Sequence, residues 1–254
     1  MNGFDVILLV ILLCCAVGAV AFYLRRRGHG SCAGCGGNCG SCALGGEARR
    51  GVVIAGYLRG TIAQAVELED GDLIVCADRG YDYAVEEKIL PDCVVGDFDS
   101  ATRRPPEGLE VVTLPSEKDE TDTYVAVSKA VESGCGEVVI VGGLGGRLDH
   151  TVANLQTLAR FADRGIKVRL QDCDTTAFLL GRGERVRIPE GSGVLSVFSY
   201  SDRAVVSERG VKYPLHRKRL TSAYPLGVSN EIEGEAEIVC HSGRLLLLLE
   251  RSGM

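Results

Sequence analysis

The stretch EVVIVGGLGGRLDHTVANLQTLARFADR, residues 137–164, contains the pattern that decides the fold. Its first five residues, Glu137 to Val141, are almost continuously apolar, which is typical of a strand buried on both faces of a parallel sheet. Four glycines follow within residues 142–146, and from Leu148 to Arg164 apolar residues recur on one helical face. A strand, a glycine-rich loop and a helix in direct succession predict an α/β unit with a ligand crevice at the carboxyl end of the strand.

The same alternation extends on both sides of this unit. A second helix is predicted over Thr121–Glu132, and further strands over Gly51–Gly56, Asp72–Ala77, Cys93–Gly96, Val111–Leu114 and Val168–Leu170. Beyond Gly181 the helical period is lost, and short strands are predicted at Val186–Ile188, Val194–Phe198, Ala204–Val206, Glu235–Cys240 and Leu245–Leu249. The fold class is therefore α/β, with an N-terminal, mainly parallel, three-layer α/β domain followed by a small C-terminal β-sandwich.

Composition narrows the class of protein. The chain has 254 residues, of which 46% are hydrophobic and 24% charged, so collagen-like and low-complexity classes are excluded. The formal net charge is −6, and the negative charge lies beyond residue 50, so nucleic acid is not an expected partner. The later cysteines lack paired spacing, which favours a reducing compartment over a disulfide framework; they are Cys76, Cys93, Cys135, Cys173 and Cys240.

The first 27 residues predict a transmembrane anchor. The run from Val6 to Leu24 contains no charge, and at 1.5 Å per residue a helix of this length is about 30 Å long, enough to span a bilayer core. Asp5 precedes the run and Arg25–Arg27 follow it, so a single pass with the body on the cytoplasmic face of the cell membrane is expected. An uncleaved signal and a wrongly assigned start codon are the alternatives.

Residues 28–50 form a linker rich in glycine and cysteine. Its cysteines, Cys32, Cys35, Cys39 and Cys42, follow the pattern CxxCxxxCxxC and are suited to Zn²⁺, Fe²⁺ or an iron–sulfur cluster. A transient metal carrier or a plain linker fits this glycine-rich segment equally well. Anchor, arginines and cysteines together resemble the small cysteine-rich membrane proteins associated with ferrous iron transporters.

Two groups of acids follow the predicted strands. Asp97 and Asp99 come directly after strand Cys93–Gly96, and residues two apart in an extended segment face the same side. A second group, Lys118-Asp119-Glu120-Thr121-Asp122, precedes a helix; Thr121 or Asp122 would serve as a helix cap, but a cap explains only one of these acids. Paired carboxylates suit Mg²⁺ bound together with substrate phosphates.

The glycine loop supplies the matching anion site. Backbone amides at the positive end of a helix favour a phosphate, and Arg147 adds charge. The chain has no complete GxGxxG and no GxxxxGK[ST], which argues against standard dinucleotide and P-loop binding. Asp149 and His150 would also fit as ordinary first-turn residues of the helix, and Asn154, one turn later, would face the same crevice.

These motifs, with a late Gly227-Val228-Ser229-Asn230-Glu231, resemble those of the thiamine pyrophosphokinase family in order and spacing over residues 51–250. The resemblance implies an α/β catalytic domain at 51–182, a thiamine-binding β-sandwich at 183–254, and a homodimer with a shared active site. It implies a transferase that moves pyrophosphate from ATP to the thiamine hydroxyl, with Mg²⁺, giving thiamine diphosphate and AMP.

The resemblance also assigns residues. It implies that Asp97, Asp99 and Asp122 are the Mg²⁺ and phosphate acids and that Lys118 and Thr121 contact the nucleotide. Arg147, Asp149 and His150 resemble the polar cluster of the family's glycine loop, and Ser229 and Asn230 its thiamine-facing pair.

The chain departs from the family in two places. It has Asp78-Arg79-Gly80 where many relatives have Asp-Gly-Gly, which leaves the local phosphate contact open. It has no Trp, so stacking on thiamine would use Tyr or Phe, such as Tyr213 or Tyr224, although each fits the sandwich core equally well. Separately, residues 216–219 are interpreted as a solvated basic turn, with phosphate contact as the alternative.

Two other functions compete with this one. The chain could be an iron-handling membrane protein with a non-catalytic nucleotide- or thiamine-binding module, or a metal-dependent kinase acting on another heterocyclic alcohol. Turnover of ATP with thiamine, and the nucleotide released, distinguish them.

Overall fold

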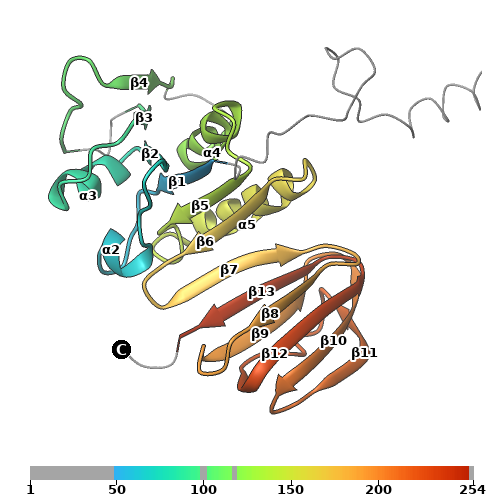
Figure 1. Cartoon of the computed structure of the whole chain (residues 1–254). Helices are drawn as coiled ribbons and strands as arrows, with labels where there is room; N and C mark the ends of the chain where they lie inside the picture. Colours follow the sequence, from blue (N-terminus) through green and yellow to red (C-terminus); the bar gives the residue numbers. More distant parts are fainter. Residues whose placement is uncertain (1–48, 98–101, 116–118, 252–254) are drawn as a thin grey trace, which may run out of the picture. The chain divides into compact units, whose positions relative to one another are not determined.

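The structure is a computed structural model of the chain and describes residues 49–97, 102–115 and 119–251 (Figure 1). The predicted anchor and cysteine array, together with Asp99 and Lys118, lie outside the described residues, so metal binding by the cysteines stays a prediction. In the described ranges, no helix has the length and apolar character needed to cross a bilayer. This finding contradicts the expected location, on the cytoplasmic face of a membrane through a single-pass anchor.

A parallel sheet organises the first half of the body. Its order is β6-β5-β1-β2-β3-β4, and every neighbouring pair is parallel. Its strands are β1 (Arg50–Ile54), β2 (Leu73–Ala77), β3 (Cys93–Gly96), β4 (Glu110–Thr113), β5 (Glu137–Val141) and β6 (Lys167–Gln171). From β1 the chain builds outward to β4, then returns to place β5 on the other side of β1. The order thus reverses between β1 and β5, where an open α/β sheet binds ligands at the carboxyl ends of its strands.

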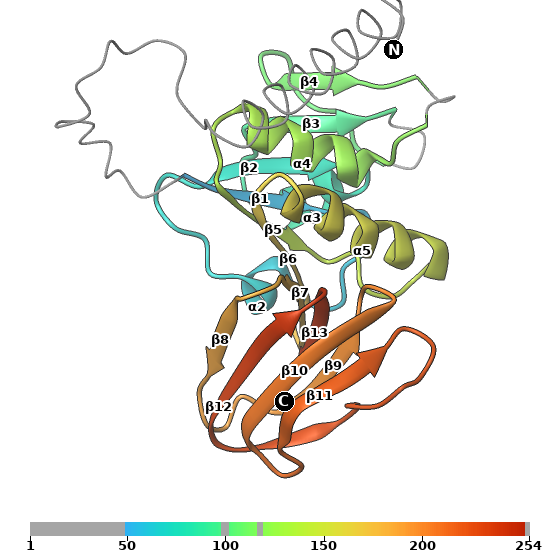
Figure 2. The same ribbon diagram turned by 90° about the vertical axis from the view of Figure 1, so that its right-hand side faces the viewer.

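Helices cover both faces of this sheet (Figure 2). On one face, α4 (Asp122–Glu132) and α5 (Leu148–Ala162) pack on Val53 and Ile140. On the other, α2 (Ile62–Ala65) and α3 (Gly80–Glu86) pack on Val52 and Val139. Neighbouring residues of a strand thus pack against helices on opposite faces of the sheet, because side chains alternate across a strand. This confirms the α/β class.

The second half is made of antiparallel strands that continue the same sheet. β7 (Thr175–Leu180) pairs with β6 and with β13 (Leu245–Glu250), which pairs with β9 (Val194–Ser199). A further group contains β8 (Arg185–Ile188), β12 (Asn230–Ser242), β10 (Arg203–Val211) and β11 (Leu215–Thr221). Buried Leu195, Val197, Ile238 and Leu245 belong to one core shared by these strands, and β7 to β13 are together called the sandwich below. The hydrogen-bonded sheet crosses the boundary predicted at residues 182/183, which stays a prediction.

The basic turn expected at residues 216–219 is wrong, because these residues form the middle of strand β11. β11 pairs only with β10 among the described strands, so it is an edge strand, and its four central side chains are exposed. Charged side chains are common on edge strands, where they discourage pairing with another chain. Helices α2 and α3 and strand β7 were also not anticipated, since each is short and lacks a clear period.

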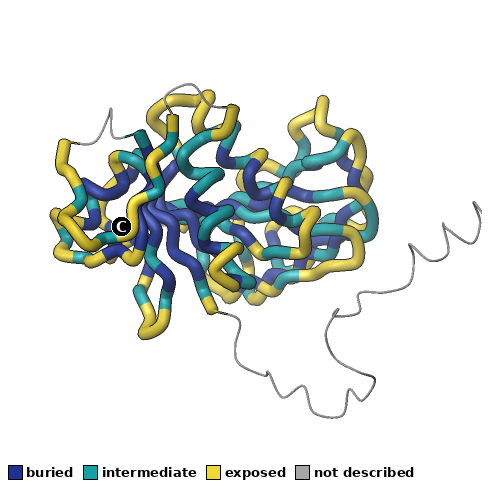
Figure 3. The backbone as a smooth tube through the Cα atoms, turned by 90° about the horizontal axis from the view of Figure 1, so that it is seen from above, coloured by how far each residue is buried: buried dark blue, intermediate teal, exposed yellow. Residues whose placement is uncertain are grey.

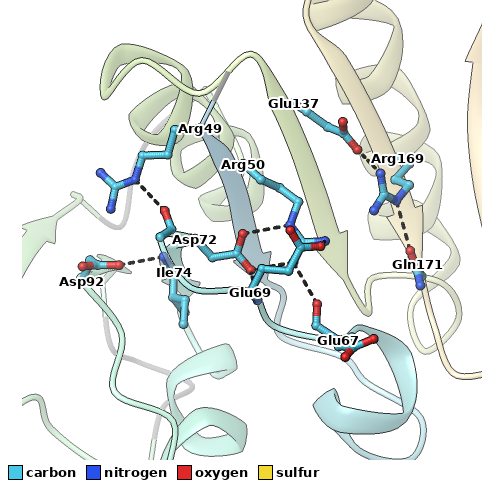
Figure 4. A network of polar contacts seen from close by, with 11 residues as sticks. Arg49, Arg50, Glu67, Glu69, Asp72, Ile74, Asp92, Glu137, Arg169 and Gln171 are labelled. Atoms are coloured by element: carbon cyan, nitrogen blue, oxygen red, sulfur yellow. Dashed lines mark hydrogen bonds and ion pairs between the residues drawn. The ribbon is translucent and has the colours of Figure 1, made fainter. Parts of the chain in front are cut away.

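Polar contacts hold together the amino ends of the parallel strands (Figure 4). Arg50 donates to both carboxylate oxygens of Asp72, at 2.8 and 2.6 Å, and lies 2.9 Å from a carboxylate oxygen of Glu69. Burial acts to raise the pKa of Asp72, but hydrogen bonds from Arg50 and from the Glu69 amide outweigh it and leave the pKa lowered. Arg169 pairs with Glu137 beside them. These charges therefore serve the structure at the amino ends of the strands. The strands between the two edges of the sheet form the buried centre of the fold, drawn in dark blue in Figure 3.

Candidate functional site

A pocket of about 590 Å³ lies at the carboxyl edge of the parallel sheet. Its walls come from the segments that follow β1, β2 and β5 and from the first turns of α4 and α5. These are the segments that flank the reversal of strand order between β1 and β5. The topology therefore places the pocket where a doubly wound sheet binds its ligand.

The pocket collects most of the predicted nucleotide residues that the structure describes. Thr121 and Asp122 line it from α4, and Arg147, His150 and Asn154 line it from the glycine loop and α5. Two groups of residues, separated by 25 positions from Asp122 to Arg147, are thus brought to one cavity, as the resemblance implies. The roles assigned to them stay predictions.

Asp97 and Asp149 are near the pocket but do not line it. Asp97 is half-buried and follows Gly96, whose backbone lies so close to Asp78 that an added Cβ would be 3.1 Å from the Asp78 Cα. Asp149 pairs with Arg147 at the mouth. Because β3 lies beside β2, Asp97 and Asp78 share one rim of the sheet.

Asp78 and Arg79 line the pocket, and sequence reasoning gave neither a role. Asp78 has a φ of +47°, a left-handed conformation uncommon for a non-glycine residue, and its amide donates to the Val95 carbonyl at 2.7 Å. Gly80 must follow, since a Cβ there would be 2.0 Å from the Ile54 carbonyl oxygen. The signal that could have found Asp78 is the one used for Asp97, an acid directly after a buried strand. The departure adds Arg79 to the lining of the cavity, with its guanidinium carbon 5.8 Å from the centroid of the Tyr83 ring.

The first turn of α4 combines a cap with an acidic wall. Thr121 is the N-cap, with extended backbone, and its hydroxyl accepts a hydrogen bond from the Tyr124 amide at 3.2 Å. Asp122 begins the helix and lines the pocket together with Glu120. The capping interpretation is therefore correct for Thr121, and Glu120 and Asp122 on either side of it both line the cavity.

The glycine loop is tightly built. Gly142, Gly143, Gly145 and Gly146 all have left-handed φ values, between +65° and +97°. The amides of Gly142 and Gly143 donate to the carbonyls of Gln171 and Tyr57, and that of Gly145 donates to the Thr151 hydroxyl. Because these three amides already have partners, the loop offers fewer donors to a phosphate than its glycine content suggests.

Two side chains of α5 hold this loop and its charge in place. The buried amide of Asn154 donates to the Gly143 carbonyl at 2.9 Å, so Asn154 shapes the loop. Arg147 donates to both carboxylate oxygens of Asp149, at 3.2 and 2.6 Å. The hydrogen bond from Arg147 lowers the pKa of Asp149, so this exposed pair is charged at neutral pH. The guanidinium is thereby oriented at the mouth of the pocket.

The thiamine-facing pair lies elsewhere. All described residues that line the pocket precede residue 155, whereas Ser229 and Asn230 lie at the start of β12 in the sandwich. The Ser229 amide donates to the Ser196 hydroxyl, and the Asn230 side chain is buried and bonded to Tyr213. Within the described part of one chain, therefore, the two predicted half-sites are separate.

The donors in the pocket suit a hard cation. Asp78, Glu120 and Asp122 supply carboxylate oxygens, the ligand type that Mg²⁺ prefers. No three or more acidic, histidine or cysteine side chains of the described residues are grouped closely enough to hold a metal by themselves. Mg²⁺ usually binds through one or two carboxylates plus substrate phosphates, so this donor set fits a Mg²⁺ that arrives with a nucleotide.

Comparison with known proteins relates this chain to one family. The family model described as "Thiamin pyrophosphokinase, catalytic domain" matches residues 65–170. The thiamine pyrophosphokinase of Bacillus subtilis (strain 168) is 30% identical over 171 residues, covering 65% of this chain and 80% of the relative; that of Caenorhabditis elegans is 26% identical over 171 residues, covering 63% and 70%.

A solved structure agrees in fold. The crystal structure of thiamine pyrophosphokinase from Bacillus subtilis has a TM-score of 0.69 at 24% identity, covering 81% of this chain and 100% of the other. On its sequence matches, the chain belongs to the thiamine pyrophosphokinase family.

Proposed function

We propose that the pocket at the carboxyl edge of the sheet is the catalytic site of this enzyme and binds ATP together with Mg²⁺. The activity is that of the family, transfer of pyrophosphate from ATP to the hydroxyl of thiamine. The observation that carries the site assignment is the convergence of Asp78, Glu120 and Asp122 with two arginines in one cavity at the switch point of the sheet. Neither strand pairing nor core packing requires such a grouping of charges.

The side chains suggest how the reaction proceeds. The thiamine hydroxyl oxygen attacks the β-phosphorus, the bond from this phosphorus to the oxygen bridging to the α-phosphate breaks, and AMP leaves as the hydroxyl proton is lost. In this proposal Arg79 and Arg147 balance the charge of the phosphates, and Asp78, Glu120 and Asp122 would hold Mg²⁺, with Asp97 beside them on the same rim of the sheet. When bound, the metal would supply charge neutralisation and a template for the phosphates. Rigid positioning by α4 and the glycine loop supplies proximity.

The nucleotide product tests this reaction. When the full chain is incubated with ATP, Mg²⁺ and thiamine, we expect AMP to appear in step with thiamine diphosphate, measured by chromatography. AMP is expected because attack at the β-phosphorus leaves the α-phosphate on adenosine. Release of ADP instead would contradict the proposal and indicate transfer of a single phosphoryl group.

We further propose that a second copy of the chain completes the site. The pocket lacks contributions from described residues of its own sandwich, and the sandwich exposes Tyr213, Tyr224 and Val228. Exposed apolar groups of this size are common where another surface binds. Ser229 and Asn230 would then meet the pocket of the partner, as the resemblance implies.

Mixed dimers test the shared site. Asp122→Asn and Asn230→Ala are each expected to be nearly inactive, the first through the phosphates and the second through thiamine. After subunit exchange, mixed dimers should regain up to about half of the wild-type turnover per dimer, since one of the two sites is then intact. Circular dichroism must show that Asn230→Ala is folded; Ser229→Ala serves as a second partner variant. Absence of recovery despite exchange, shown by differently tagged chains, would place both half-sites in one chain.

A further inference from the structure

Tyr57 lines the pocket with an aromatic ring that is fixed on one side. A Cβ added at Gly145 would lie 3.1 Å from Cε1 of the Tyr57 ring. A Cβ added at Gly146 would lie 2.7 to 3.1 Å from Cδ2, Cγ and Cε2 of the same ring. One face of the ring therefore lies over this glycine pair, which explains why no side chain fits there. The residue remains 38% exposed, and the rest of the ring borders the cavity.

The loop that carries Tyr57 is anchored at several points. The Tyr57 carbonyl accepts the Gly143 amide at 2.6 Å, and the neighbouring Leu58 is buried in the core. Arg59 pairs with Asp174 at 3.3 Å and lies 3.9 Å from a carboxylate oxygen of buried Asp172. These contacts attach the loop to β5 on one side and to the segment after β6 on the other. The ring is thus held in position before any ligand binds.

A fixed, half-exposed ring in a cavity of charged groups is suited to one class of ligand group. Carboxylates and guanidinium groups recognise phosphates and metal, but they offer no flat apolar surface. Among the described residues that line the pocket, Tyr57 is the one that carries a six-membered aromatic ring. Stacking of an aromatic side chain on a nucleobase stabilises binding without any hydrogen bond to the edge of the base.

We infer that Tyr57 is the stacking surface for the base of the nucleotide donor, and that it sets how much the base adds to nucleotide affinity. This inference rests on the proposed placement of ATP in the pocket. Stacking requires the ring and not the hydroxyl, so Phe should replace Tyr57 with little effect, whereas Leu should not. The role is specific to the base, because the phosphates are handled by other side chains.

Binding of ATP and of inorganic tripolyphosphate to the full chain tests it. Both ligands are titrated by calorimetry with Mg²⁺ and without thiamine, so that no turnover occurs. Tyr57→Leu should weaken ATP about tenfold or more while leaving tripolyphosphate within about twofold of the wild type. Tyr57→Phe should keep both affinities. Thermal unfolding of each variant verifies that the loop and fold are retained.

Other results overturn the inference. Equal weakening of both ligands by Leu would mean that Tyr57 acts only by supporting the glycine loop. A raised KM for thiamine with unchanged ATP affinity would assign the ring to the acceptor. If the wild type binds neither ligand, the proposed nucleotide site is wrong, and the inference about Tyr57 is wrong with it. If the wild type binds both ligands and Tyr57→Leu binds ATP as tightly as the wild type, only the inference about Tyr57 is wrong.

Discussion

The substitution Asp122→Asn is expected to lower turnover at least about a hundredfold. Asp122 begins α4 and lines the pocket. Asn keeps the size of the side chain but removes the negative charge that would hold Mg²⁺ against the phosphates. Loss of a metal ligand costs several kcal/mol of transition-state stabilisation, and each ~1.4 kcal/mol is tenfold in rate. Steady-state kinetics at saturating ATP and thiamine measure the effect.

The fold should survive this change. The cap of α4 is made by Thr121 and not by Asp122, and a first-turn acid adds at most about 1 kcal/mol to helix stability. Asp97→Asn is expected to behave in the same way. Part of the lost turnover should return at high Mg²⁺ or with Mn²⁺, which binds such ligand sets more tightly.

Glu107→Gln is the matched control. Glu107 is exposed in the turn before β4 and lines neither the pocket nor the core. Glu110 is a less clean control, because it pairs with Lys129 at 2.5 Å. Near-normal turnover in Asp122→Asn together with loss in Glu107→Gln would show that the site assignment is wrong.

Glu208 is expected to make the protein less stable as the pH rises from about 4.5 to 7. Its side chain is fully buried in the sandwich, where one carboxylate oxygen accepts the Asn230 amide at 3.2 Å. The other oxygen has no hydrogen-bond partner among the described residues. Burial raises the pKa of Glu208 from its usual 4.5 to about 7, and the Asn230 hydrogen bond only partly opposes this.

The sign follows from proton binding. Between pH 4.5 and 7 the folded chain holds the Glu208 proton and the unfolded chain releases it, so stability falls with rising pH. Each pH unit across this interval is worth about 1.4 kcal/mol, which gives a loss on the order of 3 kcal/mol by pH 8. Below pH 4.5 both states are protonated and the effect vanishes.

Glu208→Gln isolates this contribution. The amide side chain is neutral at every pH and can still accept the Asn230 hydrogen bond. We expect the variant and the wild type to unfold at similar urea concentrations near pH 4.5, and the variant to be more stable at pH 8 by roughly 3 kcal/mol. Other titrating groups cancel in this difference. A difference in unfolding free energy that stays constant from pH 4.5 to 8 would contradict the prediction.

The burial of Glu208 could not be predicted from the sequence. The strand expected at Ala204–Val206 ends before the polar residues Ser207-Glu208-Arg209. In the structure β10 continues to Val211, and a shift of register against β11 between Val206 and Glu208 breaks the alternation of buried and exposed residues. Three consecutive residues are then buried, and the carboxyl group is among them. A bulge depends on the partner strand, so it cannot be predicted from one strand alone.

Local pattern was sufficient for the parallel strands, for the two long helices α4 and α5, and for the family. Strands such as Glu137–Val141 and helices such as Leu148–Ala162 are set by continuous apolar runs and by a 3.6-residue period, which are properties of neighbouring residues. The motifs around Asp97, Asp122 and Arg147 indicated the family for the same reason, since each is a short segment with its own chemistry.

Only the tertiary structure decided which of these segments meet. The order of the strands brings Asp78 and Tyr57 to the same cavity as Asp122, although the sequence assigned a site role to neither. It also places Asn230 inside the sandwich, away from the pocket of its own chain. The physical reason is that periodicity and motif chemistry act over a few residues, whereas a cavity is formed by contacts between segments that the sequence separates.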